Sequence, residues 1–389
     1  MSTGITSFQP RRLTQARNLR RLHTVTALAD ISGISKQMIS RYESGTGNPT
    51  EERLVTLSEV LNLPIEFFLA PVPARNDRPI FYRSLQSALE RDRRRAENLI
   101  DIGQEVASFV DEYIDLPPNN IPIHALDQNP RLWTEDWPEW AAKQTREAFG
   151  FPSGPLPNLT ILVERMGILI IRTELAENEL DGLSRWDGSR PIIILNATKS
   201  AARSRFDLAH EIGHLVMHSQ FGSIENADSI KGLHRDMERQ AHRFAAALLL
   251  PADEFSHDLW TYNLDEFVSL KHKWQVSAQA MLQRASDLHL VSADHYVRMR
   301  KQVSARRWRV NEPMEAVVRL ETPSVLRDSL EIVATEVPGG IDLISQRLPF
   351  GNLLNEVAST TWMPAIQAGT STNMIDIRDF QRRRNPQGF

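Results

Sequence analysis

Apolar residues recur every three or four positions along most of the chain, which is the pattern of amphipathic α-helices. In the first seventy residues this pattern falls into short stretches separated by polar residues, glycine and proline. Thr24 and Ser35 stand where helix N-caps are expected, and Gly33 stands where a helix ends in a left-handed residue. The pattern predicts five short helices, with a helix, a Gly-centred turn and the helix 36–43 in the middle.

Two Ile-rich runs, 167–172 and 192–195, are bounded by Gly and Pro and are short enough to be strands. Asp187-Gly188, before the second run, is a hairpin-turn sequence. The runs predict a small sheet among the helices, and therefore a mainly α protein with an α+β core. We expect a helix that carries three tryptophans to be anchored to this core by them: Trp133, Trp137 and Trp140.

Prolines concentrate in the polar stretch 71–79, which predicts a linker. The stretch 85–113 predicts one long charged helix, with the charged run 91–95 on a solvated face. This linker and helix predict that the first five helices lie beside the rest of the protein without deep burial, so that each part can work alone. After Pro313 we expect a helix near 326–332, a turn at 338–340, a short helix near Leu343 and a frayed basic tail.

Composition narrows the class of protein. A length of 389 residues is enough for two or three domains. The absence of cysteine excludes disulfides and thiolate ligands, so any metal must be held by nitrogen and oxygen atoms. No apolar run approaches a membrane span and no apolar signal region begins the chain, so we expect a cytoplasmic protein without a membrane partner. The net charge of −4 hides a basic N-terminal segment, which favours a local nucleic-acid surface.

The residues His210, Glu211 and His214 form an HExxH motif within an apolar stretch. On a helix this spacing places both imidazoles on one face, about one turn apart, where they suit two corners of a tetrahedral metal ion. The intervening carboxylate then lies beside the metal, where it can take a proton from a water that the metal activates. A solvated helix face is the alternative, but the apolar flanks predict a buried helix, in which unpaired polar groups are costly.

A catalytic zinc ion takes three protein ligands and keeps one position open, so a third ligand is needed. A third His six residues after the second is excluded, because that residue is Gln220. Glu238 lies on the inward stripe of the next predicted helix and is the preferred candidate. His218 is its main competitor, although three ligands on consecutive turns of one straight helix rarely converge. His234 and His242 are weaker alternatives.

The segment His210-Glu-Ile-Gly-His-Leu-Val-Met-His218, followed by Glu238-x-x-Ala-x-x-Phe-Ala-Ala-x-Leu-Leu-x-Pro251, resembles the ImmA/IrrE family of zinc metallopeptidases. The resemblance extends from about residue 156 to residue 313. It implies a zincin-like core with one zinc ion, the ligands His210, His214 and Glu238, and Glu211 as the catalytic general base. Many members carry another Glu directly before the Ala, where this chain has Gln240, so Glu238 is the only carboxylate able to serve.

The N-terminal helices carry Leu28-Ala-x-x-x-Gly-Ile-Ser35 and Ser40-Arg-Tyr-Glu-x-Gly45, which resemble the Xre/Cro-type helix-turn-helix domain. The resemblance implies that helix 36–43 enters the major groove of double-stranded DNA, with Gln37 at a base edge and Arg41 at a phosphate or guanine. The candidate DNA-binding residues are Ser35, Lys36, Gln37, Ser40 and Arg41. We expect Ile34, Ile39 and Tyr42 to be core residues. Such domains usually pair across a two-fold axis, which implies a homodimer; an interaction module that no longer binds DNA is the alternative.

These observations divide the chain into four expected segments: a helix-turn-helix domain at 8–70, a linker and long helix at 71–130, a zinc metallopeptidase domain at 131–313, and a helical C-terminal region without an assigned role at 314–389. Two functions fit them. The first is a DNA-binding zinc endopeptidase that regulates transcription by cutting a partner helix-turn-helix repressor or antitoxin, as ImmA/IrrE relatives do. The second is a transcriptional regulator that uses the peptidase fold as a sensor or interaction domain and cleaves nothing.

Overall fold

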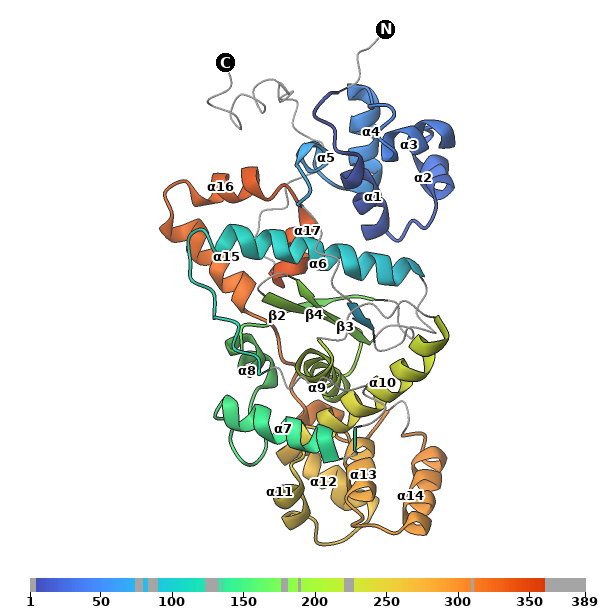
Figure 1. Cartoon of the computed structure of the whole chain (residues 1–389), viewed down its shortest axis with the longest axis vertical. Helices are drawn as coiled ribbons and strands as arrows, with labels where there is room; N and C mark the ends of the chain where they lie inside the picture. The colour runs from blue at the N-terminus through green and yellow to red at the C-terminus, as the bar shows by residue number, and fades with distance from the viewer. Residues whose placement is uncertain are drawn as a thin grey trace.

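The computed structural model describes residues 5–73, 80–82, 90–122, 133–134, 136–175, 181–187, 190–219, 227–308 and 311–360. Within these ranges the protein is mainly helical, with one small sheet (Figure 1). None of the helices in the described ranges has the length and apolar character needed to span a membrane. The prediction of a mainly α protein with an α+β core is confirmed. The predicted C-terminal tail lies outside the described residues.

The first five helices form the predicted helix-turn-helix arrangement: α1 (Pro10–Leu19), α2 (Val25–Ser32), α3 (Lys36–Glu43), α4 (Glu51–Leu61) and α5 (Ile65–Leu69). The Thr24 hydroxyl accepts a hydrogen bond from the Ala27 amide, and Ser35 caps α3 in the same way. Between them, Gly33 has a φ of 68°, which a residue without a Cβ adopts at little cost. The local sequence therefore determines both helix starts and the turn.

The sheet contains four strands in the order β1-β3-β4-β2. They are β1 (Ile80–Tyr82), β2 (Leu169–Thr173), β3 (Gly182–Asp187) and β4 (Arg190–Asn196). The strands β3 and β4 pair as an antiparallel hairpin, as predicted, although residues 188 and 189 of its turn lie outside the described residues. The strand β2 runs parallel to β4, and β1 pairs antiparallel with β3. The strand β1 comes from the stretch between the helix-turn-helix domain and the long helix, where no strand was predicted.

Helices cover both faces of this sheet (Figure 1). The long helix α6 (Glu90–Val110) lies on one face, and α9 (Ala201–Met217), which carries the HExxH motif, lies on the other. The helices on the α9 side are α7 (Asp136–Ala148), α8 (Leu159–Arg165), α10 (Ala227–Leu249), α11 (Ala252–His257), α12 (Leu264–Trp274), α13 (Ala278–Asp287) and α14 (Ala293–Ala305). The helices of the C-terminal region on the α6 side are α15 (Val325–Glu336), α16 (Gly340–Arg347) and α17 (Asn352–Ala358).

Successive strand residues face opposite sides of a sheet, and this alternation produces two hydrophobic cores. Leu183, Ile192 and Ile194 pack with α6, the helix-turn-helix domain and α15–α17. Ile170 and Ile193 pack instead with α7–α14. One core thus joins the N-terminal domain, α6 and the C-terminal helices into a single packed unit, and the other supports the HExxH helix.

The helix-turn-helix domain packs against α6 through a buried interface that the sequence did not indicate. Arg12 of α1 is 1% exposed, and its guanidinium donates hydrogen bonds to both carboxylate oxygens of Glu105 on α6, at 2.9 and 2.6 Å. The same guanidinium lies 5.1 Å from the ring centre of Phe67 and 5.8 Å from that of Phe350, just before α17. Three distant parts of the sequence therefore meet around one buried cation, and burial raises the pKa of Glu105, although its contacts with Arg12 oppose this.

Of two smaller expectations, one was wrong and the other holds only in part. The charged run on α6 is not a solvated face, because Asp92 is fully buried and pairs with Arg21, while Arg95 donates to the Leu19 carbonyl and to Glu356 of α17. Periodicity alone cannot show that another domain covers a charged face. Of the three tryptophans, Trp133 lies in the core and Trp137 packs against it, but Trp140 is 43% exposed and therefore cannot be an anchor in the core.

Candidate metal centre and DNA-binding surface

The helix α9 places the two HExxH histidines together in the protein interior. The spacing of four puts His210 and His214 on one face of the helix, and their ring centres lie 4.8 Å apart. Their Nε2 atoms are 3.1 Å apart, and both side chains are at most 1% exposed. When both Nε2 atoms are unprotonated, their lone pairs face each other in a buried site, and a cation bound between them would satisfy both.

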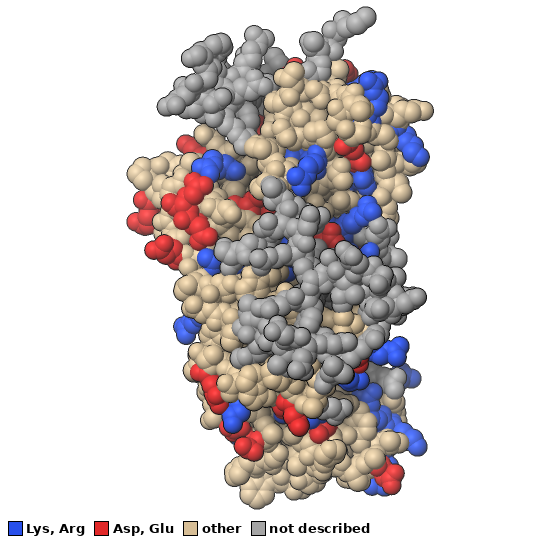
Figure 2. Space-filling model, in the orientation of Figure 1, with Lys and Arg blue, Asp and Glu red and all other residues tan. Residues whose placement is uncertain are grey.

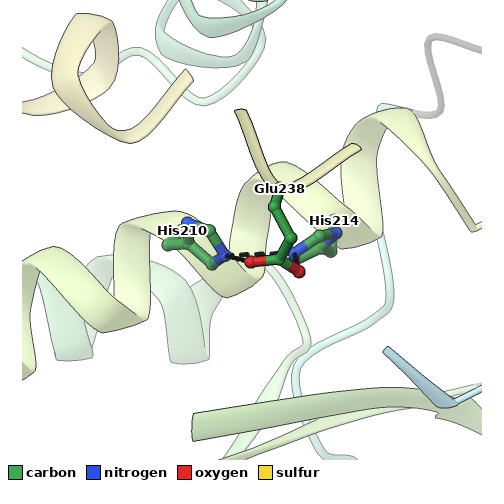
Figure 3. A group of neighbouring side chains, drawn as sticks. All are labelled: His210, His214 and Glu238. Atoms are coloured by element: carbon green, nitrogen blue, oxygen red, sulfur yellow. Dashed lines mark hydrogen bonds and ion pairs between the residues drawn. The ribbon is translucent and has the colours of Figure 1, made fainter. Parts of the chain in front are cut away.

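The helix α10 brings a carboxylate to these two rings (Figure 3). The oxygens of Glu238 lie 3.4 Å from His210 Nε2 and 3.2 Å from His214 Nε2. This approach depends on Gly213 of α9: a Cβ there would lie 3.0 Å from the Phe244 ring and 3.3 Å from the Ala241 backbone. The glycine therefore lets α10 pack close enough for Glu238 to reach the histidines.

The spacing of these three donors fits a zinc ion. They form a group in which one atom from each residue lies within 4.8 Å of the others. A tetrahedral zinc ion with bonds of about 2.0–2.1 Å holds neighbouring donor atoms roughly 3.3–3.4 Å apart. Here the two Nε2 atoms lie 3.1 Å apart, and each faces a different oxygen of Glu238: His210 faces Oε2 at 3.4 Å and His214 faces Oε1 at 3.2 Å. The Glu238 side chain is 20% exposed, so the group can be reached from solvent on that side. Two neutral imidazoles and one carboxylate are the nitrogen and oxygen ligands that catalytic zinc uses.

His218, the main competitor for the third position, lies behind His214 rather than among the three donors. Its Nδ1 is 3.0 Å from His214 Nδ1, and its Nε2 is 3.1 Å from the Gln240 side-chain oxygen. The ring stacks on Trp133, at 5.7 Å between ring centres. Burial holds the pKa of His218 well below its usual value, the neighbouring His214 lowers it further, and the hydrogen bond to Gln240 opposes both.

A neutral His218 completes a hydrogen-bonded chain from Gln240 to the site. When His214 offers its Nε2 to a metal, its Nδ1 carries the proton and donates it to His218 Nδ1. The proton of His218 is then on Nε2, where it donates to Gln240. This chain holds the His214 ring in one tautomer and orientation. Sequence reasoning treated Gln240 only as a departure from the family pattern, since its contact with His218 is visible only in the folded protein.

We expect Gln240→Ala to weaken metal binding by about 10–100-fold, because partners that orient a ligand have effects of this size. The measurement is competition for the metal with a chelator of known affinity. The matched control is Gln240→Glu, which keeps an acceptor for His218 and should bind the metal much as the original protein does. Equal affinities in all three proteins would show that the chain through His218 does not orient His214.

Glu211 points from α9 toward the sheet. It is fully buried, and its Oε2 accepts a hydrogen bond of 2.7 Å from the Ser184 hydroxyl of β3. The backbone of Gly182 lies on the other side of this carboxylate, since a Cβ added there would lie in van der Waals contact with Glu211 Oε1, at 3.4 Å. The carboxylate is thus held against β3 in one orientation. Sequence reasoning missed Ser184 as a site residue, and the only signal was its place in the Gly182-Leu-Ser segment before the second predicted strand.

The two weaker candidates, His234 and His242, lie at the margin of the group. His234 Nε2 is 3.9 Å from Glu238, one turn away on α10. His242 is exposed, and its ring centre lies 5.4 Å from that of His210. A cleft of about 880 Å³ borders the site here, and its lining includes Gln240 and His242. His210, His214 and Glu238 are not among the residues that line this cleft, so the cleft lies beside the three donors and not over them.

The helix α3 presents the candidate DNA-binding residues to solvent. All five are exposed: Ser35, Lys36, Gln37, Ser40 and Arg41. Its other face is core, as predicted, with Ile39 and Tyr42 fully buried and Ile34 8% exposed. Glu43 of α3 forms a bidentate ion pair with Arg17 of α1, at 2.7 and 3.1 Å, which fixes the orientation of α3 in the domain. Figure 2 shows basic side chains gathered over these N-terminal helices.

A buried His/Glu group on a helix packed against a small sheet defines a metallopeptidase-type domain, and the N-terminal helices define a helix-turn-helix domain. Comparison with known families agrees: residues 163–286 match the IrrE N-terminal-like domain, a peptidase family, and residues 13–68 match the helix-turn-helix family. Both resemblances are confirmed, although the peptidase match is shorter than the expected range 156–313 and leaves out residues 287–313. A comparison with curated proteins found no match. The chain is thus a DNA-binding regulator with a peptidase-like domain.

Proposed function

We propose that this protein is a zinc-dependent endopeptidase that regulates transcription by cutting a partner helix-turn-helix repressor or antitoxin. The observation that carries the proposal is the convergence of three potential metal donors, His210, His214 and Glu238, within 4.8 Å of one another in a largely buried group. The proposal assigns one zinc ion to these residues. It treats 8–70 as the DNA-binding domain and 131–313 as the catalytic domain, joined by 71–130 and followed by 314–389.

Each residue of the site has a distinct role in this proposal. The bound zinc ion would activate a water molecule and polarise the carbonyl of the scissile peptide bond. Glu211 accepts a proton from the attacking water and passes it to the leaving amine. Ser184 donates to the other side of that carboxylate and so orients it. His218 and Gln240 hold His214 in the tautomer that leaves its Nε2 free to coordinate.

The presence of a helix-turn-helix domain supports the proposal that the substrate is a protein bound near DNA. A peptidase attached to a DNA-binding domain is concentrated near repressors on the same operator, as linked modules are. The buried contacts between α1 and α6 make this attachment rigid rather than flexible. We propose a homodimer on an inverted repeat, the usual arrangement of such domains. The substrate would be cut in an exposed linker or loop.

Co-expression with the repressor encoded by a neighbouring gene tests the proposal. We expect the repressor to be cut under inducing conditions by the original protein and to stay intact with the Glu211→Gln variant, with a transcriptional response only in the first case. An uncut repressor, together with the same response from both proteins, would favour the alternative, a regulator that uses its peptidase fold as a sensor or interaction domain.

We expect Gln37→Ala to reduce sequence preference at one base pair by ~1–3 kcal/mol while general affinity for DNA stays nearly unchanged. Gln37 is exposed near the start of α3, where a reading helix contacts base edges. The measurement is binding to the protein's own promoter DNA and to single-base variants at fixed salt concentration. The contrasting variant is Lys36→Ala, which should weaken binding to all sequences alike. Absence of salt-dependent DNA binding at low ionic strength would make the domain an interaction module.

A further inference from the structure

The strand β3 is the part of the sheet that lies against the proposed catalytic base. Ser184 donates to the Glu211 carboxylate, and the backbone at Gly182 approaches the same side chain. The residues between and after them face the opposite way: Leu183 joins the core beneath α6, and Arg185 pairs with Asp101 of α6 at 2.6 Å. One face of β3 therefore belongs to the HExxH site, and its main chain runs directly beside that site.

One edge of β3 is bound to β4, and the other edge is bound to β1. The antiparallel register pairs Ile80 with Arg185, Phe81 with Ser184, and Tyr82 with Leu183. The middle pair thus lies at Ser184, the residue that holds Glu211. A short segment from the stretch between the helix-turn-helix domain and α6 occupies the strand edge nearest the proposed catalytic base.

The strand β1 is a weak occupant of this edge. It has three residues, whereas β3 has six and strands in globular proteins have about five or six. Three of the residues of β3 are paired with β1, so an incoming strand of ordinary length could form a longer ladder. A free strand edge binds an extended polypeptide through main-chain hydrogen bonds, with little regard to its sequence.

We propose that the outer edge of β3 is the binding site for the main chain of an extended polypeptide, and that residues 80–82 of this chain occupy it as an internal competitor. The proposal rests on the proposed peptidase function, because it is the nearness of Glu211 that makes a polypeptide bound there a substrate. The segment 80–82 then holds the protein in a self-blocked state, and a substrate must displace it. This would restrict cleavage to segments that pair with β3 better than three residues can.

Displacement has a measurable cost in apparent affinity. When the edge is open in about one molecule in ten, the apparent affinity for a peptide is about tenfold weaker than for the open edge. Phe81→Pro fixes φ near −65°, far from the value of about −140° in an antiparallel strand, and so disfavours the pairing of β1 with β3. Phe81→Thr is the matched control, because it removes the same side chain but does not fix φ and favours a strand.

The experiment measures binding of a fluorescein-labelled synthetic peptide with the sequence of residues 77–85 to the full chain, in a Glu211→Gln background that prevents hydrolysis. We expect the Phe81→Pro protein to bind this peptide about tenfold more tightly than the protein with Phe81, and the Phe81→Thr protein to bind it like the protein with Phe81. Equal affinities in all three proteins would overturn the proposal.

A crosslink provides a second test within one folded protein. The chain has no cysteine, so Tyr82→Cys with Leu183→Cys introduces a single pair at directly opposed positions, which are close enough for a disulfide. We expect the oxidised protein to bind the labelled peptide at least tenfold more weakly than the same protein after reduction. Unchanged binding on oxidation would place the peptide elsewhere and overturn the proposal, even where Phe81→Pro prevents folding.

These results are separate from the test of peptidase activity. The peptide is bound but not cut, so the expected binding pattern can hold in a protein that cleaves no repressor; this outcome would refute the proposed function and leave a polypeptide-binding edge. Conversely, the repressor could be cleaved while peptide binding is unchanged in the crosslinked protein. This result would support the peptidase function and refute the role of β1.

Discussion

We expect Glu211→Gln to lower the rate of repressor cleavage by a factor of about 10²–10⁴ or more, while the metal stays bound. The amide has nearly the same shape as the carboxylate and can still accept a hydrogen bond from Ser184, but it cannot take a proton from water. Glu211 is not one of the three converging donors, so the ion should lose no ligand. The measurements are single-turnover cleavage of the repressor and elemental analysis of the same preparation.

Two variants show whether the loss is specific. Glu59→Gln makes the same chemical change at an exposed position on α4 and should cleave at the original rate. Ser184→Ala keeps the carboxylate but removes the hydroxyl that orients it, and should slow cleavage by a smaller factor than Glu211→Gln. A Glu211→Gln protein that cleaves as fast as the original would exclude Glu211 as the general base.

The second large effect concerns the metal itself. Glu238→Ala should reduce metal affinity by orders of magnitude, well beyond the roughly 10–100-fold cost of losing a residue that only orients a ligand. The reason is that the carboxylate is one of three donors and the only anionic one in the group. Elemental analysis after dialysis measures the effect as moles of metal per mole of protein.

Asp236→Ala is the matched control for this variant. Asp236 is an acidic residue on the same helix, one turn or less from Glu238; it pairs with Arg239 and is not one of the three converging donors. Its replacement should leave the metal content unchanged. Full occupancy in Glu238→Ala would remove Glu238 from the site and make His218 the third ligand, with its ring turned away from Gln240.

The local features of this protein are readable from the chain because they depend on neighbours in sequence. The Thr24 and Ser35 caps, the left-handed Gly33 and the burial of Tyr42 follow from the chemistry of single residues and from helical spacing. The pairing of His210 with His214 follows from the same spacing. The Ile-rich runs predict strands for a similar reason, because short runs of β-branched residues bounded by Gly and Pro are typical of strands.

Contacts between distant segments were not readable in this way. A charged helix face has the same sequence pattern whether water or another domain covers it, so the burial of Asp92 and Arg95 could not be predicted. The burial of Arg12 depends on Glu105, 93 residues away, and on Phe350, further still. The strand β1 is only three residues long, which is too short for a periodic signal. Its pairing with β3 requires a free edge of β3, and that edge exists only in the folded sheet.

The sequence by itself determined the two kinds of domain, the HExxH helix and the preference for Glu238, because motif spacing on a regular helix dictates which side chains share a face. Only the tertiary structure decided that α10 packs on α9 at Gly213, that Ser184 and Gln240 support the site, and that one face of the helix-turn-helix domain packs against α6. These outcomes depend on how separate elements pack in space, and packing is decided by the shape and chemistry of both surfaces together.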